Sequence, residues 1–263
     1  MGFSTHPAEP ENNCDKFTGR AEAYALYRER YLPEIVLPPL REWCGLTPTM
    51  TVADIGAGTG MLGDAFRLNG NAVIAVEPNA EMRSLCKELH AADAAFHVIA
   101  GSAEETTLPD ASVDMITVGR ALHWFNMDQA LPEFRRILKP SGWVVIVASG
   151  REGSGRAENE AFEMLLRTGA NTQESTRASY VVYDQLDKFF AKGTLHHTEI
   201  PGEMHVDWNE LRGLTLSTSH APLPESENFA AFERALEEFF QRFQNEGKLT
   251  LATRTWMNAG RFE

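Results

Sequence analysis

Short apolar runs alternate with amphipathic segments between residues 51 and 148. Runs such as TVADI and WVVIVAS are rich in Val and Ile and are continuously apolar. Parallel strands that are covered on both faces have this pattern, and the segments between them have the period of helices. The pattern therefore predicts a parallel α/β sheet. Strands are expected at 51–55, 71–78, 95–101, 113–119 and 143–149, and helices at 60–70, 79–91 and 127–139.

The region before this core is less regular. Residues 1–15 are polar and rich in Pro and Asn, so we expect them to fray. A helix is expected from about Arg20, with Tyr24, Tyr27 and Tyr31 at helical spacing. Three prolines, Pro33, Pro38 and Pro39, are expected to break the chain into short helical pieces. Pro140-Ser141-Gly142 is expected to end the helix at 127–139.

The regular alternation of apolar runs and helical segments ends at the loop GREGSGRAE at 150–158, and the pattern after it is less regular. Helices are expected near 158–168 and 184–192, and strands at 195–200 and 248–258. A further helix carries apolar residues on one broad face, and we expect this face to be core rather than a ligand site. Its members are Phe229, Phe232, Leu236, Phe239, Phe240 and Phe243.

Composition and charge narrow the function classes. The chain has 263 residues, which suits one large domain or one domain with a cap. Its formal net charge of −13 repels phosphate backbones, so no nucleic-acid partner is expected. No apolar run is long enough for a membrane span, and MGFSTHPAEPENNCDKF has no apolar signal core, so we expect a cytoplasmic protein without a membrane partner.

Cysteine and histidine spacing predicts no metal site. Cys14, Cys44 and Cys86 have neither close pairing nor metal-ligand spacing, and are expected to be small buried or idle thiols. His196 and His197 have no carboxylate or cysteine at ligand spacing, so we expect a solvated pair on a strand.

The strongest local signal is VADIGAGTGMLG at 52–63. Gly56, Gly58 and Gly60 follow a strand at alternate positions and lead directly into a helix. Glycines can take positive φ and let a ligand approach the backbone, and helix N-terminal amides favour negative partial charge. Three alternate glycines are costly in chain entropy for a simple turn, so the loop predicts a nucleotide-containing cofactor.

Two cofactor classes compete for this loop. A dinucleotide fingerprint can be read through Gly58, Gly60 and Gly63, but starting at Gly56 its sixth position is Met61, where a small residue is needed. Asp54 would lie near a doubly charged pyrophosphate, whereas it suits a cofactor with an amino cation and a sulfonium.

Glu77 ends the second strand at the distance where an acid holds ribose hydroxyls. Both cofactors carry an adenosine ribose, so this residue does not discriminate between them.

Four motifs in order resemble the class I S-adenosylmethionine-dependent methyltransferases. They are VADIGAGTG, VEPNAEMR, GSAEETTLPDASVDMITVGRALHWF and EFRRILKPSGWVVIV. The HWF after the fourth strand is similar to the small-molecule, methyltransferase type 11 branch, of the trans-aconitate methyltransferase type. The resemblance covers most of the chain from about Phe17, and it includes FTGRAEAYALYRERY, LRGLTLSTSHAP and FQNEGKLTLATRTW.

The resemblance implies a doubly wound, Rossmann-like, seven-stranded, mostly parallel sheet whose last strand is antiparallel. It also implies a helical cap from the N-terminus and from a C-terminal insertion. We expect an N-terminal cap at 1–45, a cofactor-binding core at 46–150 and a C-terminal half at 151–263, together forming one structural domain.

The resemblance also implies the residues of a cofactor site. Asp54 would lie beneath the loop, Glu77 would take the ribose hydroxyls, and Arg120 would begin the segment that passes the methyl group. The implied cofactor-binding residues are Phe17, Arg20, Tyr24, Tyr27, Asp54, Gly56, Ala57, Gly58, Gly60, Glu77, Pro78, Asn79, Met82, Ser102, Ala103, Glu104, Arg120 and Ala121.

Candidate catalytic and substrate-binding residues can also be named, from motifs that are weaker than those of the cofactor site. His123 is the candidate base, although a structural histidine fits its position slightly better. Trp124 is expected to form a substrate wall or an aromatic face toward the sulfonium, with core packing as the alternative. Arg120 and Arg151 are expected to hold an anionic substrate, with a surface arginine at a strand end as the alternative for Arg151. His220 is a candidate substrate contact.

Several of these positions depart from the family pattern. An acid is common at Ser102, a glutamine at Arg120 and a tyrosine at His220, and only Arg151 remains of an asparagine-x-arginine after the fifth strand. The last three departures concern the substrate and leave the cofactor prediction unchanged.

The expected activity is methyl transfer from S-adenosylmethionine to a small molecule, a carboxylate or a phenol, by in-line displacement. Two alternatives stay open: an NAD(P)-dependent oxidoreductase that uses the Gly58 register, and a non-catalytic S-adenosylmethionine-binding protein. A monomer or homodimer is expected.

Overall fold

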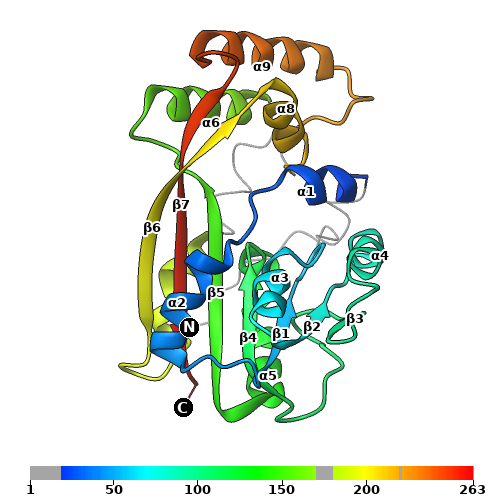
Figure 1. Cartoon of the computed structure of the whole chain (residues 1–263), viewed down its shortest axis with the longest axis vertical. Helices are drawn as coiled ribbons and strands as arrows, with labels where there is room; N and C mark the ends of the chain where they lie inside the picture. The colour runs from blue at the N-terminus through cyan, green and yellow to red at the C-terminus, as the bar shows by residue number, and fades with distance from the viewer. Residues whose placement is uncertain (1–18, 170–179, 219–220, 263) are drawn as a thin grey trace, which may run out of the picture.

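The computed structural model describes residues 19–169, 180–218 and 221–262. A seven-stranded sheet in the order β3-β2-β1-β4-β5-β7-β6 forms its centre (Figure 1). β7 is antiparallel to both of its neighbours, and the other pairs are parallel, which confirms the doubly wound, mostly parallel sheet. The strands are β1 (Thr51–Ile55), β2 (Ala72–Val76), β3 (Phe96–Ile99), β4 (Val113–Gly119), β5 (Leu138–Arg151), β6 (His196–Val206) and β7 (Leu249–Gly260).

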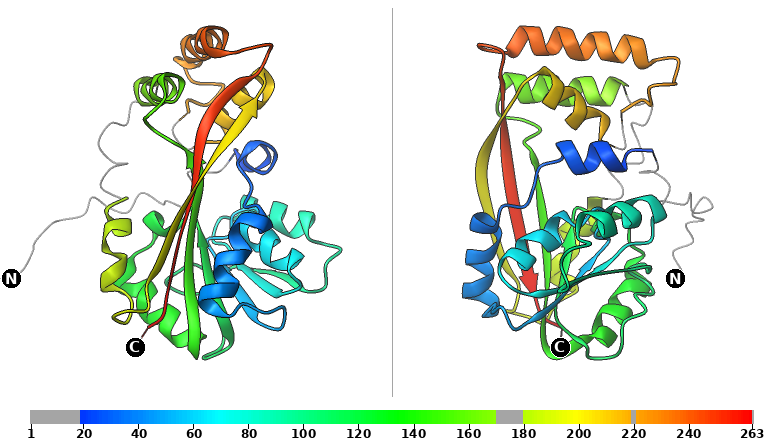
Figure 2. Two further views of the ribbon diagram at one scale, coloured as in Figure 1. Left: turned by 60° about the vertical axis from the view of Figure 1, so that its left-hand side comes forward. Right: turned by 45° about the vertical axis from the view of Figure 1, so that its right-hand side comes forward.

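Burial on both faces explains the apolar strands. In β1, Val52 and Ala53 point to opposite faces, and both are completely buried. Helices α2, α3 and α4 cover one face, and α5 with the 3₁₀ helix η3 covers the other (Figure 2). Their bounds are α2 (Pro33–Cys44), α3 (Met61–Leu68), α4 (Ala80–Leu89), α5 (Met127–Ile137) and η3 (Tyr180–Lys188).

The strand order reverses between β1 and β4. Chain connections leave β1 toward β2 on one side, while β4 lies on its other side. In open α/β sheets, ligands bind outside the carboxyl ends of the strands at this switch point, because the loops there diverge to opposite faces. The glycine loop follows β1 directly, so the topology places it at that edge.

A second layer of helices lies beyond the carboxyl edge of the sheet. β6 and β7 extend past the core to meet it (Figures 1 and 2). Its helices are α1 (Ala21–Tyr27), α6 (Ala157–Gly169), α8 (Trp208–Leu216) and α9 (Phe229–Phe243). Leu236, Phe239 and Phe240 are buried against α6 and the strand ends, and Phe232 is buried too, which confirms the α9 face as core.

The proline prediction is wrong for α2. Pro33 occupies the start of the helix, where its missing N–H is harmless, but Pro38 and Pro39 lie inside a continuous helix of 12 residues. Val36 and Leu40 are completely buried against the sheet. This burial outweighs the two hydrogen bonds that the prolines remove.

The end of α5 also differs from the prediction. The helix ends at Ile137, and β5 begins at once with Leu138, so Pro140-Ser141-Gly142 lies within a strand. The pairing passes from Val113↔Leu138 to Met115↔Trp143, so the register shifts by three residues, and this irregularity accommodates the Pro-Ser-Gly segment. The helix expected at 184–192 is a 3₁₀ helix over Tyr180–Lys188.

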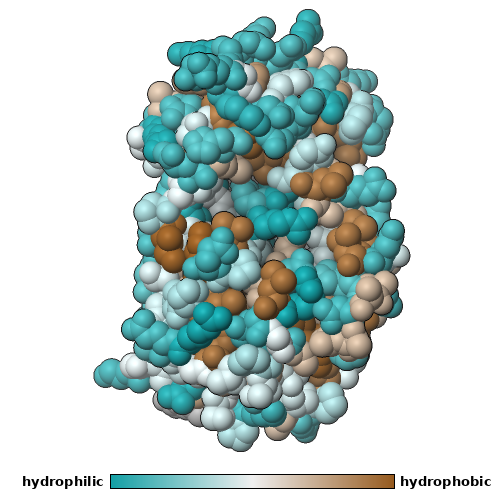
Figure 3. All heavy atoms as spheres, viewed as in Figure 1, coloured by the Kyte–Doolittle hydropathy of each residue, from teal (hydrophilic) through white to brown (hydrophobic). Residues whose placement is uncertain are grey.

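The surface has no long apolar band on the face shown in Figure 3, where hydrophobic side chains form separate groups among hydrophilic ones. Within the described ranges, none of the helices has the length and apolarity that a bilayer crossing requires.

Candidate active site

A pocket opens at the carboxyl ends of β1, β2 and β4, beneath α1. It encloses about 780 Å³ of empty space, open solvent at its mouth included. The lining residues are Tyr24, Gly56, Gly58, Glu77, Pro78, Asn79, Met82, Ser102, Ala103, Glu104, Gly119, Arg120, Ala121, Trp124 and Phe125.

The glycine loop forms the floor of this pocket. Gly56, Gly58 and Gly60 all have positive φ, at 66°, 58° and 89°. The Gly56 N–H donates to the Val76 carbonyl oxygen at 2.9 Å, which ties the loop to the end of β2. A Cβ on Gly56 would lie 2.8 Å from the Ala121 Cβ, so the backbone must be bare there.

Glu77 joins the loop to the start of α4. Its Oε2 accepts from the Gly58 N–H at 2.7 Å, and its Oε1 accepts from the Asn79 N–H at 2.8 Å. Burial raises the pKa of Glu77, and the two backbone hydrogen bonds oppose this shift. Each carboxylate oxygen keeps a lone pair, so the group can accept two more hydrogen bonds from a vicinal diol in the pocket.

Asp54 lies beneath the loop and is absent from the pocket lining. Its Oδ1 accepts from the Thr117 hydroxyl and its Oδ2 from the Gly63 N–H, both at 3.0 Å. The side chain therefore ties β1 to β4 and to the first turn of α3. Burial raises the pKa of Asp54 to about 7, against the effect of these two hydrogen bonds.

This raised pKa predicts a pH-dependent stability. Between about pH 4 and 7 the unfolded chain loses the Asp54 proton while the folded chain keeps it, so the free energy of unfolding falls as pH rises. Asp54→Asn removes this contribution. Relative to the wild type, its free energy of unfolding should increase by about 2–3 kcal/mol between pH 5 and pH 8, because one pKa unit corresponds to about 1.4 kcal/mol. Urea unfolding at both pH values measures this difference.

Asp128→Asn is the matched control, because Asp128 is exposed in the first turn of α5. It should show no such change relative to the wild type. Parallel pH profiles for Asp54→Asn and the wild type would show that Asp54 titrates at an ordinary pKa.

The side of the pocket beyond Glu77 is made of two turns. The Asn79 side chain accepts from the Met82 N–H at 2.9 Å and caps α4, as its sequence position predicts. The Ser102 hydroxyl oxygen accepts from the N–H groups of Glu104 and Glu105, both at 3.2 Å. Ser102 thus shapes its own turn, while backbone and Glu104 face the pocket beside it.

Several expected cofactor residues lie outside the pocket lining. Ala57 and Gly60 belong to the loop but are not among the lining residues. Tyr27 packs on α8, where a Cβ on Gly213 would meet its ring at 2.4 Å. Phe17 and His220 lie outside the described residues.

Arg20 holds the cap together instead of lining the pocket. Its Nη1 donates to the carbonyl oxygens of Leu216 and Thr218, both at 2.9 Å, and its Nη2 donates to that of Ala221 at 2.8 Å. Arg20 is 8% exposed, so these carbonyls have little access to water. The residue therefore fixes α1 to the C-terminal end of α8.

Arg20→Ala should lower the free energy of unfolding by about 2–4 kcal/mol, because it leaves three carbonyl groups without their charged donor. Urea unfolding measures this loss. Arg41→Ala is the control, since its hydrogen bond to Asn69 is exposed. A loss no larger than that of the control would contradict the anchoring role.

The side chains of His123 and Trp124, on the short 3₁₀ helix η2 (Leu122–Trp124), have different surroundings. Trp124 lines the pocket. His123 does not, and its Nδ1 lies 3.2 Å from the Tyr183 hydroxyl on η3. This arrangement suits a structural histidine better than a base.

Arg120 lines the pocket but is already engaged. Its Nη1 lies 3.2 Å from Glu29 Oε2, and its Nη2 donates to the Glu29 carbonyl oxygen at 3.0 Å. Its guanidinium carbon lies 4.8 Å from the centre of the Tyr31 ring. Burial lowers the pKa of Arg120, but its interactions with Tyr31, Tyr24 and Glu29 outweigh this and raise it, so the side chain stays cationic.

Arg151 is half-buried at the end of β5, with its guanidinium carbon 4.6 Å from the centre of the Phe162 ring. It is absent from the pocket lining, but its charge acts on Glu29.

Three residues at the site were missed by sequence reasoning. Gly119 and Phe125 line the pocket and flank the segment that contains Arg120 and Trp124. Both lie in the motif that ends HWF, so they could have been included from their position alone. Glu29 could not, because its partner Arg120 is 91 positions away.

Comparison with known proteins identifies the type of domain that contains this pocket. Residues 53–146 match the family model described as a methyltransferase domain, methyltransferase type 11. An uncharacterized methyltransferase of Mycobacterium tuberculosis is 34% identical over 153 residues, which cover 58% of this chain and 60% of that relative.

A malonyl-[acyl-carrier protein] O-methyltransferase of Pectobacterium atrosepticum is 33% identical over 117 residues, or 44% of this chain and 45% of that relative. The matched part thus spans less than two-thirds of either curated relative. A solved structure from Anaeromyxobacter dehalogenans, described provisionally as a type II methyltransferase, has a TM-score of 0.63 at 22% identity. It covers 89% of this chain and 98% of its own, and shows the shared fold.

The sheet has the Rossmann-like strand order of methyltransferases. Residues 53–146 form a methyltransferase type 11 domain, which belongs to the class I S-adenosylmethionine-dependent methyltransferase family. S-adenosylmethionine is the cofactor of this family.

Proposed function

We propose that this chain transfers a methyl group from S-adenosylmethionine to a small-molecule acceptor by in-line displacement. The observation that carries the proposal is the pocket at the switch point of the sheet, where the bare glycine loop and Glu77 meet within the matched methyltransferase domain. Positive-φ glycines admit a ligand against the backbone, and the Glu77 carboxylate suits ribose hydroxyls.

The polarity of the pocket suits this cofactor. S-adenosylmethionine brings an amino cation and a sulfonium, and the acids Glu77 and Asp54 lie at and beneath the loop where they would be stabilising. In this proposal Glu77 accepts from the ribose, the turns of Pro78–Met82 and Ser102–Glu104 hold the adenine, and Tyr24 covers the cofactor from α1. S-adenosylmethionine supplies an activated methyl group whose leaving group is a neutral thioether.

The protein then has mainly to align the acceptor and exclude water, which can supply roughly 7–11 kcal/mol of the barrier. Trp124 and Phe125 wall the pocket with aromatic rings, and α1 lies over it. A carboxylate acceptor is already a nucleophile and needs no base, which agrees with the absence of His123 from the lining. The relative from Pectobacterium atrosepticum bears the name malonyl-[acyl-carrier protein] O-methyltransferase, so carboxylate acceptors are screened first.

Calorimetry with S-adenosylmethionine, S-adenosylhomocysteine and NAD in parallel tests the cofactor. Binding of the first two without NAD is expected, and binding of NAD alone would support the dinucleotide alternative. Turnover is then tested by mass-spectrometric detection of S-adenosylhomocysteine with panels of carboxylic acids and phenols. Cofactor binding without turnover on any acceptor would favour the non-catalytic alternative.

A further inference from the structure

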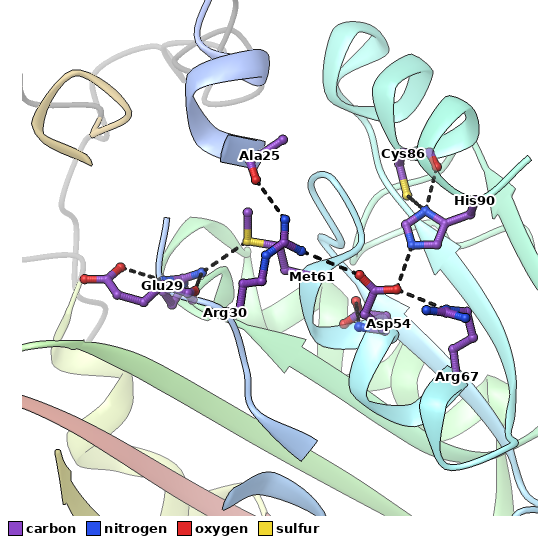
Figure 4. Close-up of polar contacts among 11 residues, drawn as sticks. Ala25, Glu29, Arg30, Asp54, Met61, Arg67, Cys86 and His90 are labelled. Carbon is purple, nitrogen blue, oxygen red and sulfur yellow. Dashed lines mark hydrogen bonds and ion pairs between the residues drawn. The ribbon is translucent and has the colours of Figure 1, made fainter. Parts of the chain in front are cut away.

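A cluster of charged side chains adjoins the pocket, at the junction of the cap and the carboxyl ends of β4 and β5. We call it the arginine cluster: Arg28, Arg120 and Arg151 around Glu29. Arg120 and Glu29 form an ion pair at 3.2 Å, with side chains only 11% and 10% exposed. Figure 4 shows Glu29 and its neighbour Arg30 directed to different partners, so Arg30 is not a member.

The cluster has a surplus of positive charge. The three arginines and Glu29 leave two positive charges in excess, in a chain whose formal net charge is −13. The charge of Glu163 on α6 also acts on Arg151. Burial raises the pKa of Glu29, but the charges of Arg28, Arg120 and Arg151 outweigh it and hold the pKa below its ordinary value. Glu29 therefore stays ionised and neutralises only part of the cluster.

Hydrogen bonding in the cluster is also incomplete. Glu29 Oε1, Arg28 Nε and Arg120 Nε are buried without a hydrogen-bond partner among the described residues. Buried polar atoms are nearly always paired, and an exception calls for a ligand or another partner. Two unused guanidinium N–H groups beside one carboxylate are what a site for a further anionic group would present.

The cluster opens to the proposed methyl-transfer site through Tyr24 and Arg120, which both line the pocket. The guanidinium carbons of Arg28 and Arg120 lie 5.3 Å and 5.9 Å from the centre of the Tyr24 ring. Arg120 is also held at a φ of 55°, a backbone conformation that costs energy for a residue with a side chain and persists where its surroundings enforce it.

We propose that Glu29 is a specificity-determining residue whose carboxylate occupies an anion subsite formed by Arg28, Arg120 and Arg151. An acceptor binds in this subsite when it carries an anionic group in addition to the atom that is methylated. That anionic group displaces the Glu29 carboxylate from the arginines. The inference rests on the proposed methyl transfer. The occupant is a carboxylate, because the Glu29 carboxylate is itself paired there with Nη1 of Arg120 at 3.2 Å, while Nη2 donates to the Glu29 carbonyl oxygen.

Calorimetry on the protein loaded with S-adenosylhomocysteine tests the subsite, with malonate as the probe and its neutral diamide as the control ligand. Glu29→Gln removes the internal competitor, so malonate affinity should rise about tenfold or more while the diamide is unaffected. Arg151→Gln should lower malonate affinity by about tenfold. Glu22→Gln on exposed α1 and Arg30→Gln are matched controls and should bind malonate like the wild type.

The outcomes separate the two proposals. A wild type that does not bind S-adenosylhomocysteine contradicts the methyltransferase function itself. Normal cofactor binding, with malonate affinity unchanged in both Glu29→Gln and Arg151→Gln, overturns the anion subsite alone. If Glu29→Gln does not fold, Arg151→Gln decides, and malonate affinity equal to that of the wild type overturns the proposal. Inorganic phosphate is a further probe, and tightening by Glu29→Gln would extend the subsite to phosphorylated acceptors.

Discussion

Glu77→Gln is expected to weaken S-adenosylhomocysteine binding by about 10²-fold, the largest effect on affinity that the site predicts. The substitution removes the charge and one of two acceptor oxygens, and hydrogen bonds to charged groups contribute about 1.5–3 kcal/mol each. It also leaves either the Gly58 or the Asn79 N–H without its acceptor, since both donate to the Glu77 carboxylate. Calorimetric titration of the folded variant gives the dissociation constant.

Two further variants separate ligand contact from loop support. Glu88→Gln changes a carboxylate on the exposed surface of α4 and should leave affinity unchanged. Glu77→Ala removes both oxygens and lets water reach the two amides, so it should bind at least as weakly as Glu77→Gln. A folded Glu77→Gln variant that binds within about threefold of the wild type would show that Glu77 supports the loop without holding the ribose.

The core of the fold was predictable because local pattern and tertiary burial agree there. Val52 and Ile116 lie in strands that are covered on both faces, so continuous apolar runs were sufficient to identify them. Predictions from the preference of a single residue, such as the helix-breaking effect of proline, were wrong where burial in the core outweighs that preference. Pro38 is tolerated inside α2 because Leu40 and its neighbours are packed against the sheet, and no local rule contains that packing energy.

The pocket was predictable where its residues lie in the sequence motifs at strand ends. Gly56, Gly58 and Glu77 follow β1 and β2 directly, and parallel strands bring their carboxyl ends to one edge. Side-chain direction was not predictable. His123 and Trp124 are adjacent in the chain, yet one faces Tyr183, 60 positions away, and the other faces the pocket.

Long-range partners explain the other departures. Arg20 was expected at the cofactor, but carbonyl groups about 200 positions later take its donors. Arg120 was expected to hold an anionic substrate, and the structure places the carboxylate of Glu29 on it. In both cases an arginine was expected to bind an anion or another hydrogen-bond acceptor. Only the fold determines which acceptor lies within its reach.

Gly60→Ala is expected to cause the largest loss of stability among single methyl additions to the loop. Gly60 has a φ of 89°, and a Cβ there would lie 2.7 Å from His90 Cε1 and 2.9 Å from Cys86 Sγ. His90 cannot withdraw easily, because its Nδ1 and Nε2 are hydrogen-bonded to the Cys86 carbonyl oxygen and to Asp64. Left-handed strain of about 1–2 kcal/mol and overpacking of about 1–3 kcal/mol together predict a loss of about 2–5 kcal/mol.

Gly58→Ala separates strain from overpacking at the same loop. Gly58 has a φ of 58°, but its Cβ would meet nothing closer than Tyr24 Cε1 at 4.0 Å, so only the strain of about 1–2 kcal/mol is expected. Gly153→Ala is the control, because Gly153 has open space and no positive φ. Urea unfolding should rank the losses as Gly60→Ala, Gly58→Ala and Gly153→Ala.

The two alanine variants, Gly58→Ala and Gly60→Ala, should rank in the opposite order for loss of cofactor affinity and for loss of stability. Gly58 lines the pocket and Gly60 does not, so a methyl group on Gly58 enters the space between the loop and Tyr24. Gly58→Ala should therefore weaken S-adenosylhomocysteine binding more than Gly60→Ala, measured under conditions where both variants are folded. Equal affinities would mean that the cofactor does not pass over Gly58, and the loop would then serve the fold rather than the ligand.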